Sequence, residues 1–262
     1  MLIDTHCHLD FKQFDADRQD VINRAKEQGI GYIINVAADL KGSVQSLKLA
    51  AEYDCIFATA GIHPHYALKT GEDELRQLRE LTENKKIVAL GEVGLDYYNH
   101  EAEHFLIDRK IKLKQQELLC AFIEIARERQ LPIIFHCREA HDDLLAILKD
   151  NLKGRVKAVV HCFSGSKEFL RNCLELGIKV SFTANITYKK ADDLRDIVSY
   201  VPLEEMFLET DAPFLAPQAK RGKRNEPSYT EYIAQEVARI KKMDAGKVAD
   251  ITTRSARLFF NI

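Results

Sequence analysis

The sequence of 262 residues lacks a large net charge, a dense set of cysteines and a long apolar run. Its 38 Lys and Arg residues nearly balance its 40 Asp and Glu residues, so the formal net charge is -2. This balance excludes a uniformly basic nucleic-acid coat and a strongly acidic tail, although it leaves room for local basic patches. No apolar run approaches the roughly 18 to 20 residues that span a bilayer, which excludes a membrane-spanning helix.

Cysteine usage and the amino terminus together favour the cytoplasm. Six cysteines with no Cys-x-x-Cys pair are too few for a disulfide scaffold and are typical of a reducing compartment. The first ten residues include acids and histidines, so we expect no signal peptide. We therefore predict a cytoplasmic protein that does not engage a membrane.

One architecture recurs along the chain, and no Pro-rich or Ser-rich linker divides it. A short apolar run, mostly rich in β-branched residues, is followed each time by an amphipathic stretch. Such runs, without clean polar alternation, are typical of parallel strands that are buried on both faces. The eight runs are residues 2–5, 31–37, 56–61, 87–91, 132–135, 157–160, 178–182 and 206–209.

Helical periodicity is clearest over residues 111–130, where apolar side chains recur on one face. Gly29, Gly154 and Gly177 lie where expected helices should end. The other seven expected helices are residues 18–28, 44–51, 74–83, 141–151, 167–176, 192–201 and 229–241.

Eight strand-helix units in a chain of this length predict a parallel, eight-stranded (β/α)8 TIM barrel, an α/β fold in one domain spanning residues 1–262. The alternative is a doubly wound open sheet. Neither Gly-x-Gly-x-x-Gly nor Gly-x-x-x-x-Gly-Lys-Ser/Thr occurs in the sequence, which argues against that alternative.

Polar side chains gather where five of the expected strands end. In a barrel these carboxyl ends converge on one mouth, and His6 and His8 can point the same way because they are two residues apart in extended chain. Burying so many titratable groups is costly unless divalent cations provide counter-charge. The predicted metal ligands are His6, His8, Glu92, His136, His161 and Asp211.

Two divalent cations per chain suit this set better than one. Six ligands exceed the three or four that a single catalytic zinc uses, and Glu92 is the natural bridge because it offers two oxygens. Mixed imidazole and carboxylate donors admit Mg, Mn or Zn without selecting among them.

Cys7, Cys137 and Cys162 each follow a predicted ligand and should point toward the helix layer as small core residues. Thiolate ligation or nucleophilic catalysis is the alternative for these cysteines.

The motifs around these residues resemble those of the TatD family of metal-dependent deoxyribonucleases, within the amidohydrolase-like barrels, over essentially the whole chain. The resemblance implies a (β/α)8 fold, a dinuclear or potentially dinuclear site with the same six ligands, and phosphodiester hydrolysis on DNA. The matching segments are Asp4-Thr5-His6-Cys7-His8-Leu9-Asp10, Gly61-Ile62-His63-Pro64-His65, Gly91-Glu92-Val93-Gly94-Leu95-Asp96, His136-Cys137-Arg138-Glu139-Ala140, His161-Cys162-Phe163-Ser164-Gly165, Glu209-Thr210-Asp211-Ala212-Pro213 and Arg224-Asn225-Glu226-Pro227.

The expected reaction on DNA is attack of a metal-bound hydroxide on phosphorus. We expect digestion from an end, an exonuclease activity, because a barrel mouth suits a strand terminus better than a continuous duplex. Asp211, as general base, and Glu92 are the expected catalytic residues. Substrate contacts are expected from His63 and Arg138 at the mouth, and from Arg221 and Arg224 in the basic cluster at residues 220–224. We expect DNA to bind without sequence specificity, because the sequence shows no base-reading element.

Two other functions stay open at this point. One is hydrolysis of a small ester, amide, lactone or phosphoester by the same metals, and the other is a non-enzymatic scaffold whose basic cluster binds a partner. Tyr97 and Tyr98 either stack on a base or anchor their loop, and His100 and His104 are expected to be exposed. The sequence does not fix the oligomeric state, and a monomer is compatible with it.

Overall fold

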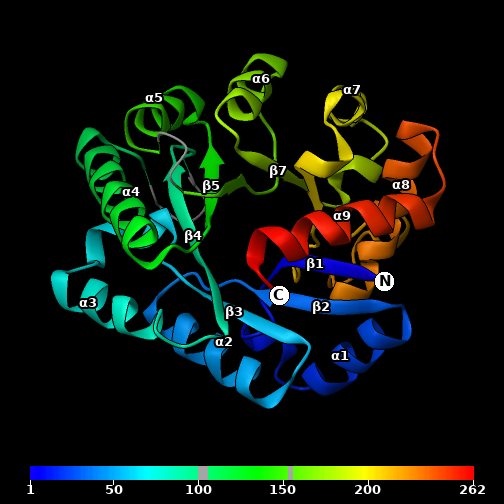
Figure 1. Cartoon of the computed structure of the whole chain (residues 1–262), viewed down its shortest axis with the longest axis horizontal. Helices are drawn as coiled ribbons and strands as arrows, with labels where there is room; N and C mark the ends of the chain where they lie inside the picture. Colours follow the sequence, from blue (N-terminus) through cyan, green and yellow to red (C-terminus); the bar gives the residue numbers. More distant parts are fainter. Residues whose placement is uncertain (100–105, 153–155) are drawn as a thin grey trace.

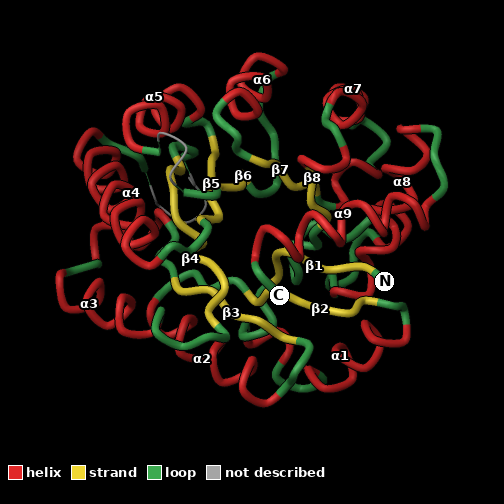
Figure 2. The backbone as a smooth tube through the Cα atoms, in the orientation of Figure 1, coloured by secondary structure: helices red, strands yellow, loops and turns green. Residues whose placement is uncertain are grey.

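The eight strands of the computed structural model, which describes residues 1–99, 106–152 and 156–262, form one parallel barrel (Figures 1 and 2). They pair in chain order from β1 to β8. This arrangement confirms the predicted (β/α)8 fold. The strands are β1 (Leu2–Cys7), β2 (Ile30–Asn35), β3 (Ile56–Ala60), β4 (Ile87–Asp96), β5 (Ile133–Arg138), β6 (Ala158–Val160), β7 (Lys179–Phe182) and β8 (Met206–Leu208).

Helices surround the barrel, and each strand is followed by one of them, as the sequence predicts (Figure 1). Gly29 and Gly177, with φ of 76° and 71°, end α1 and α6 as expected, whereas the prediction for Gly154 lies outside the described residues. The eight are α1 (Arg18–Glu27), α2 (Leu40–Glu52), α3 (Glu72–Leu81), α4 (Arg109–Arg129), α5 (His141–Asn151), α6 (Lys167–Glu175), α7 (Asp192–Tyr200) and α8 (Thr230–Lys241).

The barrel closes where β1 meets the segment after β8. A parallel bridge joins Cys7 to Ala212, and the amide of His8 donates to the carbonyl of Ala212 at 2.8 Å. The amide of Asp211 donates in turn to the carbonyl of His6 at 2.9 Å. The closure excludes the doubly wound open sheet. It also places the backbone of three predicted ligands in a single seam.

A further helix, α9 (Ala245–Phe260), lies across the amino ends of the strands (Figure 1). Its Phe259 and Phe260 pack on Phe207 of β8, with ring centroids 5.0 and 5.6 Å apart, respectively. Thr253 donates to the carbonyl of Met1 at 3.0 Å. The sequence did not predict this helix, because two threonines and two alanines on its buried face weaken the apolar stripe. It forms the floor of the barrel, so the opposite end is the open mouth.

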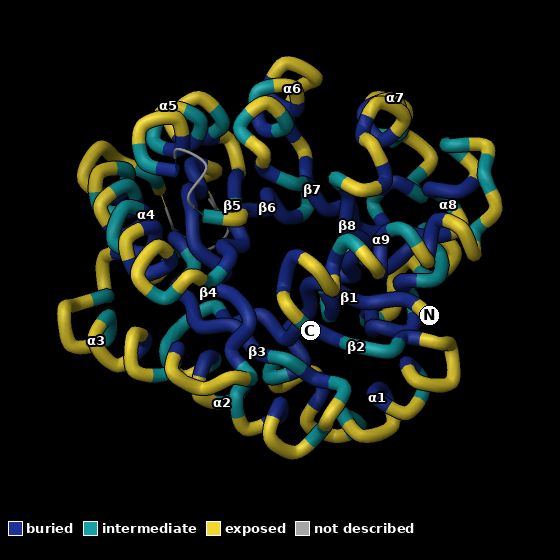
Figure 3. The backbone as a smooth tube through the Cα atoms, viewed as in Figure 1, coloured by how far each residue is buried: buried dark blue, intermediate teal, exposed yellow. Residues whose placement is uncertain are grey.

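Burial follows the layers that a barrel requires. The strands and the inward faces of the helices are buried, whereas the outward helix faces are exposed (Figure 3). Most of the apolar core fills the space between sheet and helices, and a smaller cluster fills the barrel interior above α9. None of the helices in the described ranges combines the length and the apolarity that a bilayer crossing requires.

Strand β4 extends further than the sequence suggests. The expected run ended at Gly91, but β4 continues to Asp96 and pairs Gly94 with His136 of β5. A Cβ on Gly94 would collide with the carbonyl oxygen of His136, so this glycine permits a close approach of β4 and β5 beyond Gly91, the expected end of the strand. The predictions for His100 and His104, which follow this strand, lie outside the described residues.

Candidate metal centre at the barrel mouth

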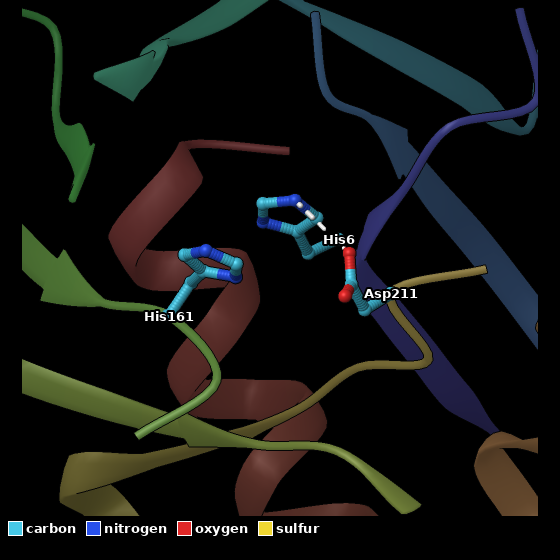
Figure 4. A group of neighbouring side chains, drawn as sticks. All are labelled: His6, His161 and Asp211. Atoms are coloured by element: carbon cyan, nitrogen blue, oxygen red, sulfur yellow. Dashed lines mark ion pairs between the residues drawn. The ribbon is translucent and has the colours of Figure 1, made fainter. Parts of the chain in front are cut away.

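The six predicted ligands meet at the mouth of the barrel although they come from five different strand ends. Figure 4 shows three of them, His6, His161 and Asp211, pointing toward one another. The imidazoles of His6 and His161 stack with ring centroids 4.1 Å apart and planes inclined by 14°. The spatial convergence expected from the strand ends is therefore observed.

Glu92 lies at the centre of this cluster, and its two carboxylate oxygens face different histidines. Oε2 lies 3.5 Å from Nε2 of His6 and 3.9 Å from Nε2 of His8. Oε1 lies 2.5 Å from Nδ1 of His136 and 2.7 Å from Nε2 of His161. The carboxylate thus divides the cluster into two halves and belongs to both.

Asp211 completes the half that contains His6 and His8. Its Oδ1 lies 3.3 Å from Nε2 of His8 and 3.8 Å from Nε2 of His6. The side chains of Asp211 and His136 are 15% and 16% exposed, respectively, whereas those of His6 and Glu92 are at most 5% exposed. Asp211 and His136 therefore stand on the side of the cluster that a water or substrate reaches first.

A buried asparagine holds the turn that carries Asp211. Asp211 has a φ of 55°, in the left-handed region that few residues other than glycine adopt. Asn225, which is fully buried, donates to the carbonyls of Thr210 at 2.8 Å and of Phe214 at 2.6 Å. Its Oδ1 accepts from the amide of Glu226 at 3.0 Å. The surrounding structure thus fixes a backbone conformation that Asp211 would not adopt freely.

Backbone and carboxylate oxygens behind the cluster fix the orientation of the imidazoles. The Nδ1 atom of His8 lies 2.7 Å from the carbonyl oxygen of Val36, so Nδ1 carries a proton and Nε2 is the atom that could act as a ligand. Nδ1 of His161 faces Glu209 at 3.5 Å. Contacts of this kind on the far nitrogen are typical of metal-binding histidines.

Asp96 faces the far nitrogen of His136 in the same way, and the sequence analysis assigned no role to Asp96. Its Oδ2 lies 3.3 Å from Nε2 of His136 and 2.9 Å from Nε2 of His65. Gln115 of α4 fixes this strand end by accepting from the Asp96 amide at 2.9 Å and donating to its carbonyl at 3.1 Å. The signal was present in the even spacing of Glu92 and Asp96, which places both on one face of a strand. It was missed because the strand was expected to end at Gly91.

Charges within the cluster compensate one another. Burial would raise the pKa of the Glu92 carboxyl, but the charges of His161 and His63 help to hold that pKa well below its ordinary value. Burial would lower the pKa of His8, but its hydrogen bond to Asp211 and the charge of that acid raise the pKa to about 9. Without a cation, protonated imidazoles therefore supply the positive charge. A bound cation would replace those protons.

The donor set fits divalent cations. Three overlapping groups each bring one ligand atom per residue within 4.8 Å of the others. Imidazole nitrogens and carboxylate oxygens are the donors that Zn, Mn and related cations accept. His63 belongs to one group, with its Nε2 at 3.7 Å from Oε1 of Glu92. The sequence predicted a substrate contact for His63 and not a position among the ligands. The groups are His6 with His161 and Asp211, His6 with His8 and Glu92, and His63 with Glu92 and His136.

The cysteines next to the ligands differ in their surroundings. Cys7 and Cys137 are buried in the core between sheet and helices, as predicted. Cys162 is half-buried in the turn after β6, where its Sγ lies 3.6 Å from Oγ1 of Thr183. Burial raises the pKa of the Cys162 thiol to about 12 and that of Cys7 well above its ordinary value. Neither thiol is ionised near neutral pH, which argues against nucleophilic catalysis.

The predicted phosphate-binding arginines lie at the rim of the mouth. Arg138, at the end of β5, is exposed and stands over the Tyr98 ring at 3.7 Å from the centroid. Arg221, also exposed, stands over the Tyr188 ring at 4.4 Å. Tyr97 is buried and hydrogen-bonded to another side chain, in agreement with loop anchoring.

Arg224 has protein partners. Its guanidinium donates to both carboxylate oxygens of Asp17 at 2.8 and 2.7 Å and stacks over Phe14. The neighbouring Glu226 accepts from Arg24 of α1 at 2.6 Å. These two ion pairs join the loop after β8 to α1, and the phosphate contact expected of Arg224 stays a prediction.

Replacing Glu226 by glutamine should cost stability at neutral pH but little in acid. Burial would raise the pKa of Glu226, but hydrogen bonds from Arg24 and Ser228 lower it below the ordinary 4.5. A carboxyl with a lowered pKa in the folded state stabilises the fold above its ordinary pKa and loses this effect as the pH falls through the folded value. The difference in unfolding free energy between the wild type and Glu226→Gln, measured in urea, should therefore shrink below pH 4.5.

Glu175→Gln provides the matched control. Glu175 is 67% exposed, and its Oε1 lies 3.9 Å from Nε of Arg171, which is long for an ion pair. Loss of its charge should therefore change stability little at any pH. A difference for Glu226→Gln that stays constant on acidification would contradict the assignment.

Comparisons with known proteins agree with the fold. A sequence model of the family of TatD-related DNases matches residues 3–261. The chain is 39% identical to YabD of Bacillus subtilis, an uncharacterized metal-dependent hydrolase, with full coverage of both. It is 35% identical to a protein of Erwinia tasmaniensis named 3'-5' ssDNA/RNA exonuclease TatD, again with full coverage of both. The crystal structure of the TatD homologue YJJV of Escherichia coli superposes with a TM-score of 0.90 at 32% identity, covering 100% of this chain and 98% of the other.

Proposed function

The chain belongs to the family of TatD-related DNases, which are metal-dependent hydrolases, and we propose that it removes nucleotides from the end of a DNA strand by hydrolysing phosphodiester bonds. The observation that carries this proposal is the central position of Glu92, with two histidines facing its Oε2 and three facing its Oε1. We infer that this cluster would hold two divalent cations, with Glu92 as a ligand of both.

The two halves of the cluster define the proposed ligand sets. His6, His8 and Asp211, with Oε2 of Glu92, would hold one cation, and His136 and His161, with Oε1 of Glu92, would hold the other. Divalent cations in such a pair would lower the pKa of a coordinated water and offset charge on phosphate oxygens.

The protein's own groups would then handle the proton and the substrate. Asp211 is the proposed general base, because its carboxylate is on the accessible side of the cluster and its backbone is held by the closing seam. His63 also reaches the accessible side, with 14% of its side chain exposed, and we assign it contact with the scissile phosphate. Arg138 and Arg221 at the rim would bind flanking phosphates.

The expected substrate is a strand end, bound without sequence specificity. The chain's net charge of -2 limits electrostatic attraction to the few basic side chains at the rim, so affinity should be modest and should fall as salt rises. The name of the Erwinia relative specifies a 3'-5' direction and single strands, and we extend both properties to this chain.

Digestion of end-labelled oligonucleotides tests the proposal. With the label at the 5' end, single strands should shorten one nucleotide at a time in the presence of Mg²⁺, Mn²⁺ or Zn²⁺. Treatment with a chelator should stop the reaction, and addition of the cation should restore it. Double-stranded substrates of the same sequence should be cut more slowly.

Two outcomes would contradict the proposal. Equal activity before and after chelation, with metal content measured in the same samples, would exclude the cation chemistry. Activity on small esters or amides with none on oligonucleotides would favour the alternative of a small-molecule hydrolase on the same scaffold.

A further inference from the structure

Two phenylalanines stand beside His8 at the mouth, and none of the roles assigned so far uses them. Phe11 stacks on the His8 imidazole with ring centroids 4.7 Å apart and planes inclined by 17°. Phe214 meets Phe11 edge-on at 6.1 Å and His8 at 6.3 Å. The Phe214 ring nevertheless stays 47% exposed. An apolar ring left in water beside the candidate metal centre forgoes the free energy that burial would provide.

Backbone hydrogen bonds hold both rings in fixed relation to the predicted ligands. The amide of Phe11 donates to the carbonyl of His8 at 3.1 Å. The amide of Phe214 donates to the carbonyl of Asp211 at 2.9 Å, and its own carbonyl accepts from Asn225 at 2.6 Å. The aromatic pair is thus built onto the same two chain segments that carry His8 and Asp211.

We propose that Phe11 and Phe214 form a stacking subsite for the base of the nucleotide whose phosphodiester bond lies at the metal centre. This inference rests on the proposed function. Phenyl rings stack on any base, because every base has a π face, and they offer no hydrogen bond by which to tell bases apart. Such a subsite explains how a substrate end is held in register without being read for sequence.

The subsite also determines which strands fit. The terminal base must unstack from the adjacent base to lie against Phe214. An unpaired base does so at a lower free-energy cost than a base that must also break its base pair. The preference for single strands is then a property of the aromatic pair. Charge at the rim, contributed by Arg138 and Arg221, attracts single and double strands alike.

A fluorescent base tests stacking separately from turnover. We would use a single-stranded oligonucleotide with 2-aminopurine as its 3' base and a phosphorothioate in the last linkage to slow hydrolysis. Binding to the wild type should quench the fluorescence. Phe214→Ala should lose the quenching and weaken binding roughly five- to hundredfold, which is the range that stacking on one aromatic ring provides. Phe214→Tyr keeps the ring and should retain both properties, whereas Phe214→Leu should resemble Phe214→Ala.

Kinetics with an abasic 3' nucleotide provide a second readout. Removing the base should raise KM for the wild type by about the same factor as Phe214→Ala does with the intact substrate, and Phe214→Ala should show little further loss on the abasic substrate. Tyr200→Ala is the matched control, because Tyr200 is an aromatic residue 61% exposed at the end of α7, outside the mouth. It should leave both quenching and KM unchanged.

The outcomes separate the two proposals. A wild type that cleaves oligonucleotides while Phe214→Ala changes neither quenching nor KM overturns the stacking subsite alone. A wild type that cleaves no oligonucleotide with any of the cations overturns the proposed function, and the subsite with it.

Discussion

Replacing Asp211 by asparagine should lower kcat for phosphodiester hydrolysis by about 10³-fold and leave the fold intact. Asparagine keeps the volume of the side chain and one oxygen, but it cannot accept the proton of the attacking water. The hydrogen bonds from the Asp211 amide to His6 and from Phe214 to the Asp211 carbonyl belong to the backbone and survive the change. Turnover at saturating oligonucleotide and thermal unfolding followed by circular dichroism would measure the two effects.

A second acid at the rim serves as the control for Asp211. Asp142, at the start of α5, is exposed, and Asp142→Asn should keep wild-type turnover. If raising the cation concentration restored full turnover to Asp211→Asn, Asp211 would act only as a ligand, and its assignment as general base would be wrong. Full activity without added cation would exclude both roles.

Replacing Glu92 by glutamine should remove most cation binding and, with it, activity. The amide is neutral, and only one of its two heavy atoms can act as a ligand, so it cannot serve both halves of the cluster. We expect fewer bound cations per chain and an affinity loss larger than the roughly 10- to 100-fold caused by losing a group that only orients a ligand. Calorimetric titration with Mn²⁺ and elemental analysis of the dialysed protein would measure both quantities.

Glu209→Gln provides the comparison for Glu92→Gln. Glu209 is buried and lies behind the cluster, where its Oε1 faces Nδ1 of His161 at 3.5 Å and accepts from the Cys162 amide at 2.7 Å. Its replacement should weaken binding by only about 10- to 100-fold and leave the number of cations unchanged. Two cations bound to Glu92→Gln with wild-type affinity would show that Glu92 is not a bridge.

The convergence of the ligands could be predicted from the sequence because it depends on topology more than on detail. Once eight buried runs are taken as parallel strands, the carboxyl end of every strand lies at one edge, and histidines such as His136 and His161 must gather there. His6 and His8 follow from the two-residue period of extended chain. None of these steps requires a side-chain conformation.

What the sequence could not provide depends on distances between segments far apart in the chain. The role of Asp96 needed the true end of β4, which is set by the close approach of Gly94 to His136 on the neighbouring strand. The pairing of Arg224 with Asp17 brings together residues 207 positions apart, and a run of basic residues alone predicts a solvated surface. Phe11 and Phe214 likewise meet only after the barrel has closed.

The floor helix has a consequence for how the protein matures in a cell. All the proposed ligands have been translated once Asp211 is made, yet α9, at residues 245–260, is still to come, and Thr253 of that helix bonds to Met1. A nascent chain on the ribosome therefore carries every donor atom, and the segment that closes the barrel against β1, before its floor helix has been made. We expect the centre to hold its ions firmly only once α9 has left the exit tunnel and covers the amino ends of the strands.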